Sequence, residues 1–333
     1  MLLKSTPLSN ISTASLLGTG LSVLLCLSLS GAAEAASISK TAATRLHKSW
    51  RTTITTTALP GQGCFTADYP SLVWKQVACT NAPGHPFAPA HRAPAGFGDD
   101  YSAQVTSPIT MAVGSFPAIT GLASEKSAGV SDQYSLQLNT PYFSSPACQS
   151  SPDPQDCEVW QQFVFAQSGG KKGVSSGFME YWLINYGPYC PSGWNQAALN
   201  CWIDSAAVSV PHQKLSALGG LQLSGAAAKS GNDSVTVTTS KKAYAISAAD
   251  SFLDLAGSWR GAEFNVLGET AGSQANFNKG TNITVNISLT DGSTTAPSCG
   301  TNDIFTYETN NLGLGSCKGA SGNNPSITFS ESD

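Results

Sequence analysis

Two glutamates and one glutamine carry the main chemical potential of this chain, and all three lie in segments whose alternation predicts β-strands. They are Glu180, Glu263 and Gln162. A carboxylate can act as a general base on water, and a nearby side-chain amide can donate hydrogen bonds to a developing oxyanion. Glu263 with Gln162 would supply that combination, whereas Glu263 with Glu180 could form the carboxyl pair of a glycosidase. Composition and spacing alone favour a simpler interpretation, in which all three are ordinary polar strand residues.

Other catalytic chemistry has little basis in the sequence. Only four histidines occur, at positions 47, 85, 91 and 212, and the first three precede residue 98. Neither an H-E-x-x-H zinc motif nor a C-x-x-C pair is present. We therefore expect no metal and no cofactor, and the remaining tools are carboxylates, amides and aromatic rings.

Alternation along three segments sorts the side chains onto two faces, because successive residues of a strand point in opposite directions. In 158–166 one parity is apolar except for Gln161, and the other predicts a groove with Trp160 and Gln162. In 177–186, Glu180 and Trp182 share a face, and in 262–267 Glu263 lies opposite an apolar set. The prediction is three strands with a core face and a polar face each.

The segments that surround these residues predict an all-β fold. Short runs rich in Ser, Thr, Val and aromatic residues recur between turn residues, as half-buried strands prefer. The predicted strands are 101–107, 133–140, 158–166, 177–186, 205–210, 219–228, 234–240, 243–248, 262–268, 282–289 and 326–330. That number over about 230 residues favours a two-sheet sandwich or jelly roll. Only 248–256 is a helix candidate, of one or two turns.

Composition narrows the function classes. Charged residues make up 11% of the 333 residues, far below the roughly 25% of an average globular chain. The chain also contains 32 Gly and 18 Pro. Such a chain is no coiled coil, and it lacks the basic patches of a nucleic-acid binder. We expect a monomer.

The N-terminus predicts export. Lys4 precedes a leucine-rich stretch over 16–29, which ends in an A-x-A cleavage pattern at 33–35. We assign residues 1–35 to a signal peptide and expect a secreted protein with no membrane segment once the signal is removed. Eight further cysteines fall in close pairs and predict four disulfides. The pairs are Cys64 with Cys79, Cys148 with Cys157, Cys190 with Cys201, and Cys299 with Cys317.

Charge divides the rest of the chain at residue 98. Residues 36–98 hold six basic residues and one acidic residue, a net charge of +5, whereas 99–333 hold ten basic and nineteen acidic residues, a net charge of −9. Residues 36–98 are thus a basic N-terminal extension, and 99–333 are the predicted β-sandwich domain. The extension is either a removable pro-segment that caps an acidic cleft or a solvated arm. Residues 83–97 are rich in Pro and Ala and predict a linker.

Three of these segments resemble the eqolisin-type glutamic peptidases. Residues 259–266 (WRGAEFNV) are similar to the segment around that family's catalytic glutamate, which falls on Glu263. Residues 177–186 resemble a Glu-containing strand of the family, with Glu180 on its glutamate. The family's catalytic glutamine matches Gln162 best, with Gln161 as the alternative on the opposite face. Neprosin-type peptidases are a looser match.

The resemblance is confined to short motifs over about 105–290. Phe163 and Val164 replace the Thr-Gly that follows the family's glutamine, and Ala166 replaces its Asp. Instead of a second glutamate after the A-E-F motif, this chain has Leu-Gly-Glu at 267–269.

The resemblance implies a concanavalin-like sandwich and a peptidase mechanism without a cofactor. Glu263 would deprotonate a water, the Gln162 amide would hold the oxyanion, and Trp160, Glu180 and Trp182 would line a groove for a polypeptide. Acidic pH would favour activity. Two alternatives stay open: a glycan-binding, lectin-like sandwich without catalysis, or a glycoside hydrolase, with exposed tryptophans as platforms for sugar rings.

Overall fold

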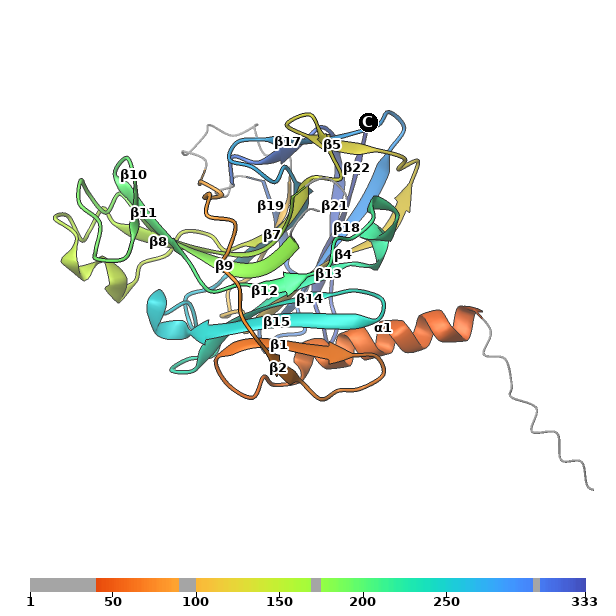
Figure 1. Ribbon diagram of the computed structural model, residues 1–333, viewed down its shortest axis with the longest axis horizontal. Coiled ribbons are helices and arrows are strands. Elements are labelled where there is room, and N and C mark those ends of the chain that lie inside the picture. Colours follow the sequence, from red (N-terminus) through yellow and green to blue (C-terminus); the bar gives the residue numbers. More distant parts are fainter. Residues whose placement is uncertain (1–39, 90–99, 169–174, 302–305) are drawn as a thin grey trace, which may run out of the picture. The chain divides into compact units, whose positions relative to one another are not determined.

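The structure is a computed structural model that describes residues 40–89, 100–168, 175–301 and 306–333. The predicted signal peptide and the predicted domain boundary at residue 98 lie outside these ranges, as does part of the predicted linker. Residues Lys40–Asp333 form one compact unit. As predicted, this unit is built almost wholly of strands, arranged as a sandwich of two large antiparallel sheets (Figure 1).

The sheet that we call the outer sheet has nine strands, in the order β2-β1-β15-β14-β13-β4-β18-β22-β21. Their bounds are β1 Gly63–Asp68, β2 Lys75–Val77, β4 Met111–Thr120, β13 Gln222–Ala226, β14 Asn232–Thr238, β15 Lys242–Ala249, β18 Asn282–Thr290, β21 Gly313–Ala320 and β22 Ser326–Ser332. The predicted strands did not include β4, β21 or the two strands that precede residue 98.

The second sheet, the inner sheet, runs β10-β11-β9-β8-β7-β16-β3-β19, with β12 also paired to β9. Its strands are β3 Ser102–Gln104, β7 Tyr134–Asn139, β8 Glu158–Gln167, β9 Ser175–Ile184, β10 Asn195–Ala197, β11 Asn200–Asp204, β12 Val208–Val210, β16 Gly261–Leu267 and β19 Ser298–Gly300. A small third sheet contains β5 Glu125–Ser127, β6 Val130–Ser131, β17 Gln274–Phe277 and β20 Thr309–Asn310. The helical elements are α1 Lys40–Thr56 and the 3-10 turns η1 Pro146–Ser150, η2 Leu215–Gly220 and η3 Asp250–Phe252.

Aromatic rings of the inner sheet lie directly over glycines of the outer sheet. A Cβ atom at Gly114 of β4 would come within 2.1 Å of the Phe264 ring, and one at Gly225 of β13 within 2.4 Å of the Phe163 ring. Both phenylalanines are fully buried in the main core cluster. The apolar parities of 158–166 and 262–267 therefore face the core, as predicted, and the polar parities face the other way.

The described part of the N-terminal extension packs against the sandwich. Strand β1 pairs with β15 along its whole length, from Gly63↔Ser247 to Asp68↔Lys242, and α1 lies against the same edge (Figure 1). Trp50 and Ile54 of α1 are buried in a second apolar cluster together with Phe65 of β1. Burial of side chains of this size contributes about 1.5–3 kcal/mol each, so this part of the extension is not a solvated arm.

Helix α1 is an element that the sequence did not predict. Its sequence is rich in threonine, a poor helix former, and several of its threonine hydroxyls donate to main-chain carbonyls four residues earlier, as Thr55 does to Arg51 at 2.7 Å. Burial of Trp50 and Ile54 outweighs this weak local preference.

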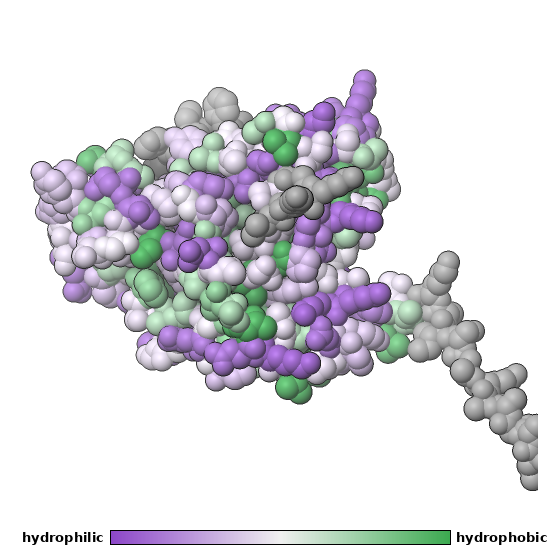
Figure 2. All heavy atoms as spheres, viewed as in Figure 1, coloured by the Kyte–Doolittle hydropathy of each residue, from purple (hydrophilic) through white to green (hydrophobic). Residues whose placement is uncertain are grey.

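All four predicted disulfides are present and join neighbours in sequence: Cys64–Cys79, Cys148–Cys157, Cys190–Cys201 and Cys299–Cys317. Within the described ranges, no helix is long and apolar enough to cross a bilayer. On the face drawn in Figure 2, apolar side chains form small separate patches among polar ones.

Candidate active site

Five polar residues form one row across the inner sheet, on the face turned away from the core. Strand register places Glu263 opposite Asn139, Asn139 opposite Gln162, Gln162 opposite Glu180, and Glu180 opposite Asp204. We call Glu263, Asn139, Gln162, Glu180 and Asp204 the polar row. Its members come from β16, β7, β8, β9 and β11, so antiparallel pairing brings together residues up to 124 positions apart. The three residues singled out from the sequence all belong to it.

The alternative glutamine lies on the other face of β8. Gln161 points into the core, where its Nε2 donates to Asp233 Oδ2 at 2.9 Å and contacts the sulfur of Met179 at 3.9 Å. Gln161 and Asp233 are both fully buried. A one-residue shift along a strand reverses the direction of the side chain, so the structure places Gln162, and not Gln161, beside Glu180.

Tryptophans form a second row beside the polar row. Trp160 pairs with Trp182, and Trp182 with Trp202, across β8, β9 and β11, with ring centroids 6.5 and 6.3 Å apart. Trp160 Nε1 donates to the Thr140 carbonyl at 2.7 Å. Trp160 and Trp182 have no exposed surface, so they are not open platforms for sugar rings in this structure.

Glu263 is held by its neighbour in the polar row. Asn139 Nδ2 donates to Glu263 Oε2 at 3.0 Å, and Glu263 is 3% exposed. Asn139 was not singled out from the sequence, although strand 133–140 was. Asn139 and Gln137 point to the same face of that strand. This pair of polar side chains was the sequence signal by which Asn139 could have been identified.

The Gln162 amide lies between β7 and β9. With its nitrogen toward β9, it donates to the Phe87 carbonyl at 2.8 Å and to Glu180 Oε1 at 3.0 Å. With its nitrogen toward β7, it donates to Gln137 Oε1 and Asn139 Oδ1, each at 3.2 Å. The first orientation is preferred because a main-chain carbonyl can only accept. In it, Gln162 presents N–H donors to a peptide carbonyl.

Glu180 binds main chain and indole through one oxygen. Its Oε1 accepts from the Phe87 N–H at 2.9 Å and from Trp182 Nε1 at 2.7 Å. Complete burial, strengthened by the carboxylate of Asp204, raises the pKa of Glu180 well above its ordinary value. Burial also raises the pKa of Asp204, to about 6. Above about pH 6 Glu180 is therefore the protonated member of this pair, with ionised Asp204 as its acceptor.

A segment of the N-terminal extension covers the polar row. Residues 80–89, which we call the strap, run from the edge of the outer sheet across the inner sheet (the orange line over β12 and β9 in Figure 1). Phe87 of the strap is fully buried. The sequence predicted an open groove here, with 83–97 as a linker. The described part of that segment instead lies against the polar row, where the main chain of Phe87 contacts Glu180 and Gln162.

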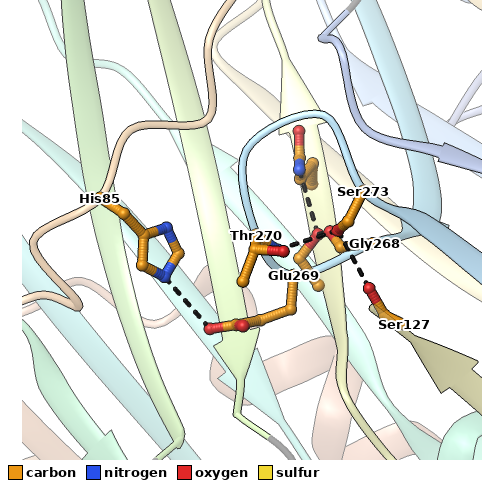
Figure 3. A network of polar contacts seen from close by, with 8 residues as sticks. His85, Ser127, Gly268, Glu269, Thr270 and Ser273 are labelled. Carbon is orange, nitrogen blue, oxygen red and sulfur yellow. Dashed lines mark hydrogen bonds and ion pairs between the residues drawn. The ribbon is translucent and has the colours of Figure 1, made fainter. Parts of the chain in front are cut away.

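An ion pair anchors the strap beside the row. His85 Nε2 lies 3.4 Å from Glu269 Oε1, and the contact with Glu269 raises the pKa of His85 (Figure 3). The turn that carries Glu269 is itself braced, because Ser273 Oγ accepts from the Thr270 N–H at 3.0 Å and from Ser127 Oγ at 2.9 Å. Glu269 is one of the residues at which the chain departs from the eqolisin pattern.

Other possible sites in the described ranges give less support for catalysis. In the described ranges no group of three or more His, Cys, Asp or Glu residues could hold a metal ion. A string of the form G-x-S-x-G does occur at 173–177, but its Ser175 begins β9 and pairs with Val210, rather than standing between a strand and a helix as a nucleophile would. A cavity of about 440 Å³ lies under α1 on the outer sheet, and none of the candidate catalytic residues lines it.

Comparison with known proteins finds likeness in fold alone. No protein-family model and no curated protein matches the chain. Among solved structures, scytalido-glutamic peptidase with a peptide-based transition-state analogue is 13% identical, with a TM-score of 0.32 over 72% of this chain and 98% of that chain. SCP-B, a member of the eqolisin family of peptidases in a complex with the tripeptide Ala-Ile-His, is 11% identical, with a TM-score of 0.30 over 71% of this chain and 97% of that chain. The chain is thus distantly similar in fold to eqolisin-type glutamic peptidases, as its sequence motifs suggested.

Proposed function

We propose that this protein is an exported glutamic endopeptidase that acts at acidic pH on polypeptides. The observation that carries the proposal is the arrangement around Phe87. A peptide carbonyl of the chain itself lies 2.8 Å from the Gln162 amide nitrogen, in the same row of side chains as Glu263. The four disulfides fit an oxidising compartment, in keeping with export.

In the proposed mechanism, Glu263 is the general base and Gln162 the oxyanion donor. Ionised Glu263 takes a proton from a water, and the water oxygen attacks the carbonyl carbon of the substrate. The Gln162 amide stabilises the negative charge that develops on the carbonyl oxygen. Protonated Glu263 then gives its proton to the leaving amine as the C–N bond breaks. Asn139 is a positioning residue, since it holds Glu263 through the bond at 3.0 Å.

The spacing of the row favours this assignment over a glycosidase. Neighbouring strands lie about 4.8 Å apart, and one strand (β7) separates Glu263 from Gln162. Two strands separate Glu263 from Glu180, a backbone distance of roughly 14 Å, which is wide for carboxyl groups that must end about 5–9.5 Å apart.

The extension is the proposed pro-segment. Its strap occupies the groove, its charge is opposite to that of the sandwich, and its removal would expose the polar row. We place its boundary near residue 98 and the mature sandwich at 99–333, acting as a monomer.

The test is hydrolysis of denatured casein at pH 2–7, measured on the full chain after incubation at pH 3–4. Glu263→Gln should lower the rate at least 100-fold. Glu158→Gln, the same change at the start of β8 and outside the row, is the matched control and should keep the wild-type rate. Hydrolysis by Glu263→Gln at the wild-type rate would refute the mechanism.

A further inference from the structure

The strap lies on the inner sheet in the manner of a bound peptide. At one end, Thr80 and Ala207 exchange two main-chain hydrogen bonds of 2.8 Å each. At the other end, the Tyr307 N–H donates to the Ala88 carbonyl at 3.0 Å, and Pro89 pairs with Thr306. Main-chain bonds of this kind hold extended peptides on sheets without regard to their sequence.

The side chain of Phe87 is fully buried. Its ring lies in an apolar cluster with Val164, Ala166, Phe178 and Ala207, and its centroid is 6.2 Å from that of Phe178. These four residues belong to the inner sheet and the loop that precedes β12. We call them the Phe87 pocket. His85 of the strap also lies against the Phe87 ring, with centroids 5.3 Å apart, and Ala82 of the strap packs against the cluster. The four walls of the pocket themselves belong to the sandwich and would remain without the strap.

The main chain of Phe87 is held by two members of the polar row. Its N–H donates to Glu180 at 2.9 Å, and its carbonyl accepts from Gln162 at 2.8 Å. One peptide residue is thus fixed at three points, namely its N–H, its carbonyl and its side chain. That is the contact set by which a peptide-binding cleft selects one residue of a ligand.

We infer that the Phe87 pocket is a subsite for a large apolar side chain of a polypeptide, and that this residue supplies the carbonyl presented to Gln162. The strap occupies the subsite with the chain's own Phe87. The inference rests on the proposed function only in naming that carbonyl as the one attacked; the selective binding of the side chain stands apart from catalysis.

The residues that line the Phe87 pocket explain why it would bind a large apolar side chain. Val164 and Phe178 are aliphatic and aromatic, and Ala166 and Ala207 leave room for a ring. A charged or amide side chain would lose its hydrogen bonds to water there without replacement, whereas glycine would leave the apolar walls unfilled. The peptide bond to be cleaved would therefore follow Phe, Tyr, Leu or Met.

A binding experiment tests the pocket without requiring catalysis. Phe87→Ala empties the pocket in the full chain, and the probe is N-acetyl-L-phenylalanine amide, with N-acetylglycine amide as the comparison. Phe65→Ala is the matched control, because Phe65 is also a buried phenylalanine of the extension but lies in the cluster under α1. At pH 4 we expect the phenylalanine probe, and not the glycine probe, to bind saturably by calorimetry and to raise the melting temperature of Phe87→Ala alone. Equal responses of both variants, or no response of Phe87→Ala, would overturn the inference.

A cleavage experiment tests the same pocket in the wild-type chain and does not depend on the folding of a variant. Fragments of a reduced and alkylated protein digested at pH 3–4 are identified by mass spectrometry. We expect cleavage after Phe, Tyr, Leu and Met to be at least tenfold more frequent than after Gly, Asp or Lys. Hydrolysis without this preference would overturn the subsite and leave the proposed function standing. Selective binding of the probe without any hydrolysis would support the subsite and refute the proposed function.

Discussion

Phe87 and Glu180 are 93 residues apart in the chain and are joined by a hydrogen bond of 2.9 Å between a main-chain N–H and a carboxyl oxygen. The bond links the basic extension to the polar row of the acidic sandwich. Under the proposed function, the strap of the intact chain would compete with an added substrate for the polar row.

Loss of the Phe87 ring should therefore raise the activity of the intact chain. Removal of a buried phenylalanine typically costs about 3–5 kcal/mol, and here that cost falls on the docking of the strap. We expect Phe87→Ala to hydrolyse a short Phe-containing peptide several-fold faster than the wild type at pH 4, before any processing. Phe65→Ala should leave the initial rate unchanged; an unchanged rate in Phe87→Ala would show that the strap does not limit access.

The two adjacent glutamines should respond differently to substitution. Gln162→Ala removes the oxyanion donor and should lower kcat by about 10²–10³-fold. Because Gln162 is also fully buried and donates to the Phe87 carbonyl, this change should lower the free energy of unfolding by about 1–3 kcal/mol as well. Gln161→Ala leaves the buried Asp233 without its donor and should lower the free energy of unfolding by about 1–3 kcal/mol, with little change in kcat. Rate measurements and urea unfolding separate the two effects, and the opposite pattern would reassign the catalytic glutamine.

Buried carboxyl groups should make the fold most stable at acidic pH. Burial raises the pKa of Glu125 and of Asp233 to about 8, and that of Glu308 to about 7. Because these groups hold protons in the folded chain that they lose in the unfolded chain, stability decreases as the pH rises from about 4 to about 8. We expect urea midpoints to fall between pH 4 and pH 8.

A single variant isolates one part of that pH dependence. Asp233→Asn keeps an oxygen for Gln161 but has no proton to lose, so its stability should decline less over the same pH range, by an amount on the order of a few kcal/mol. If both proteins showed the same slope, Asp233 would not contribute to the pH dependence.

The ion pair between His85 and Glu269 should stabilise the position of the strap in a way that depends on pH near neutrality. The contact with Glu269 raises the pKa of His85. Its stabilising contribution is therefore complete below the ordinary histidine pKa of about 6.5 and is lost as the pH rises through the raised value. Hydrogen exchange of strap amides should be faster in His85→Gln than in the wild type at pH 5.5, with the difference vanishing at pH 8.5. A difference that grew toward pH 8.5 would contradict this account.

Local alternation predicted the faces of individual strands correctly, because the side-chain direction of a strand repeats every two residues. The pattern of 158–166 placed Phe163 toward the core and Gln162 away from it. Alternation could not predict which strands pair, so Asn139 between Glu263 and Gln162 was missed. The strap was missed for another reason: its Pro-rich sequence has little local preference, and Phe87 is fixed by distant strands, through the apolar pocket and the hydrogen bonds to Glu180 and Gln162.

The disulfide Cys64–Cys79 closes entirely within the extension, and the other three bridges lie entirely within the sandwich. A single backbone cut after the strap would thus divide the polypeptide into two separate molecules, each with its own internal crosslinks. Inhibition of the sandwich by the cleaved extension would then be a bimolecular equilibrium. It would be strong in concentrated solution and would be relieved by simple dilution.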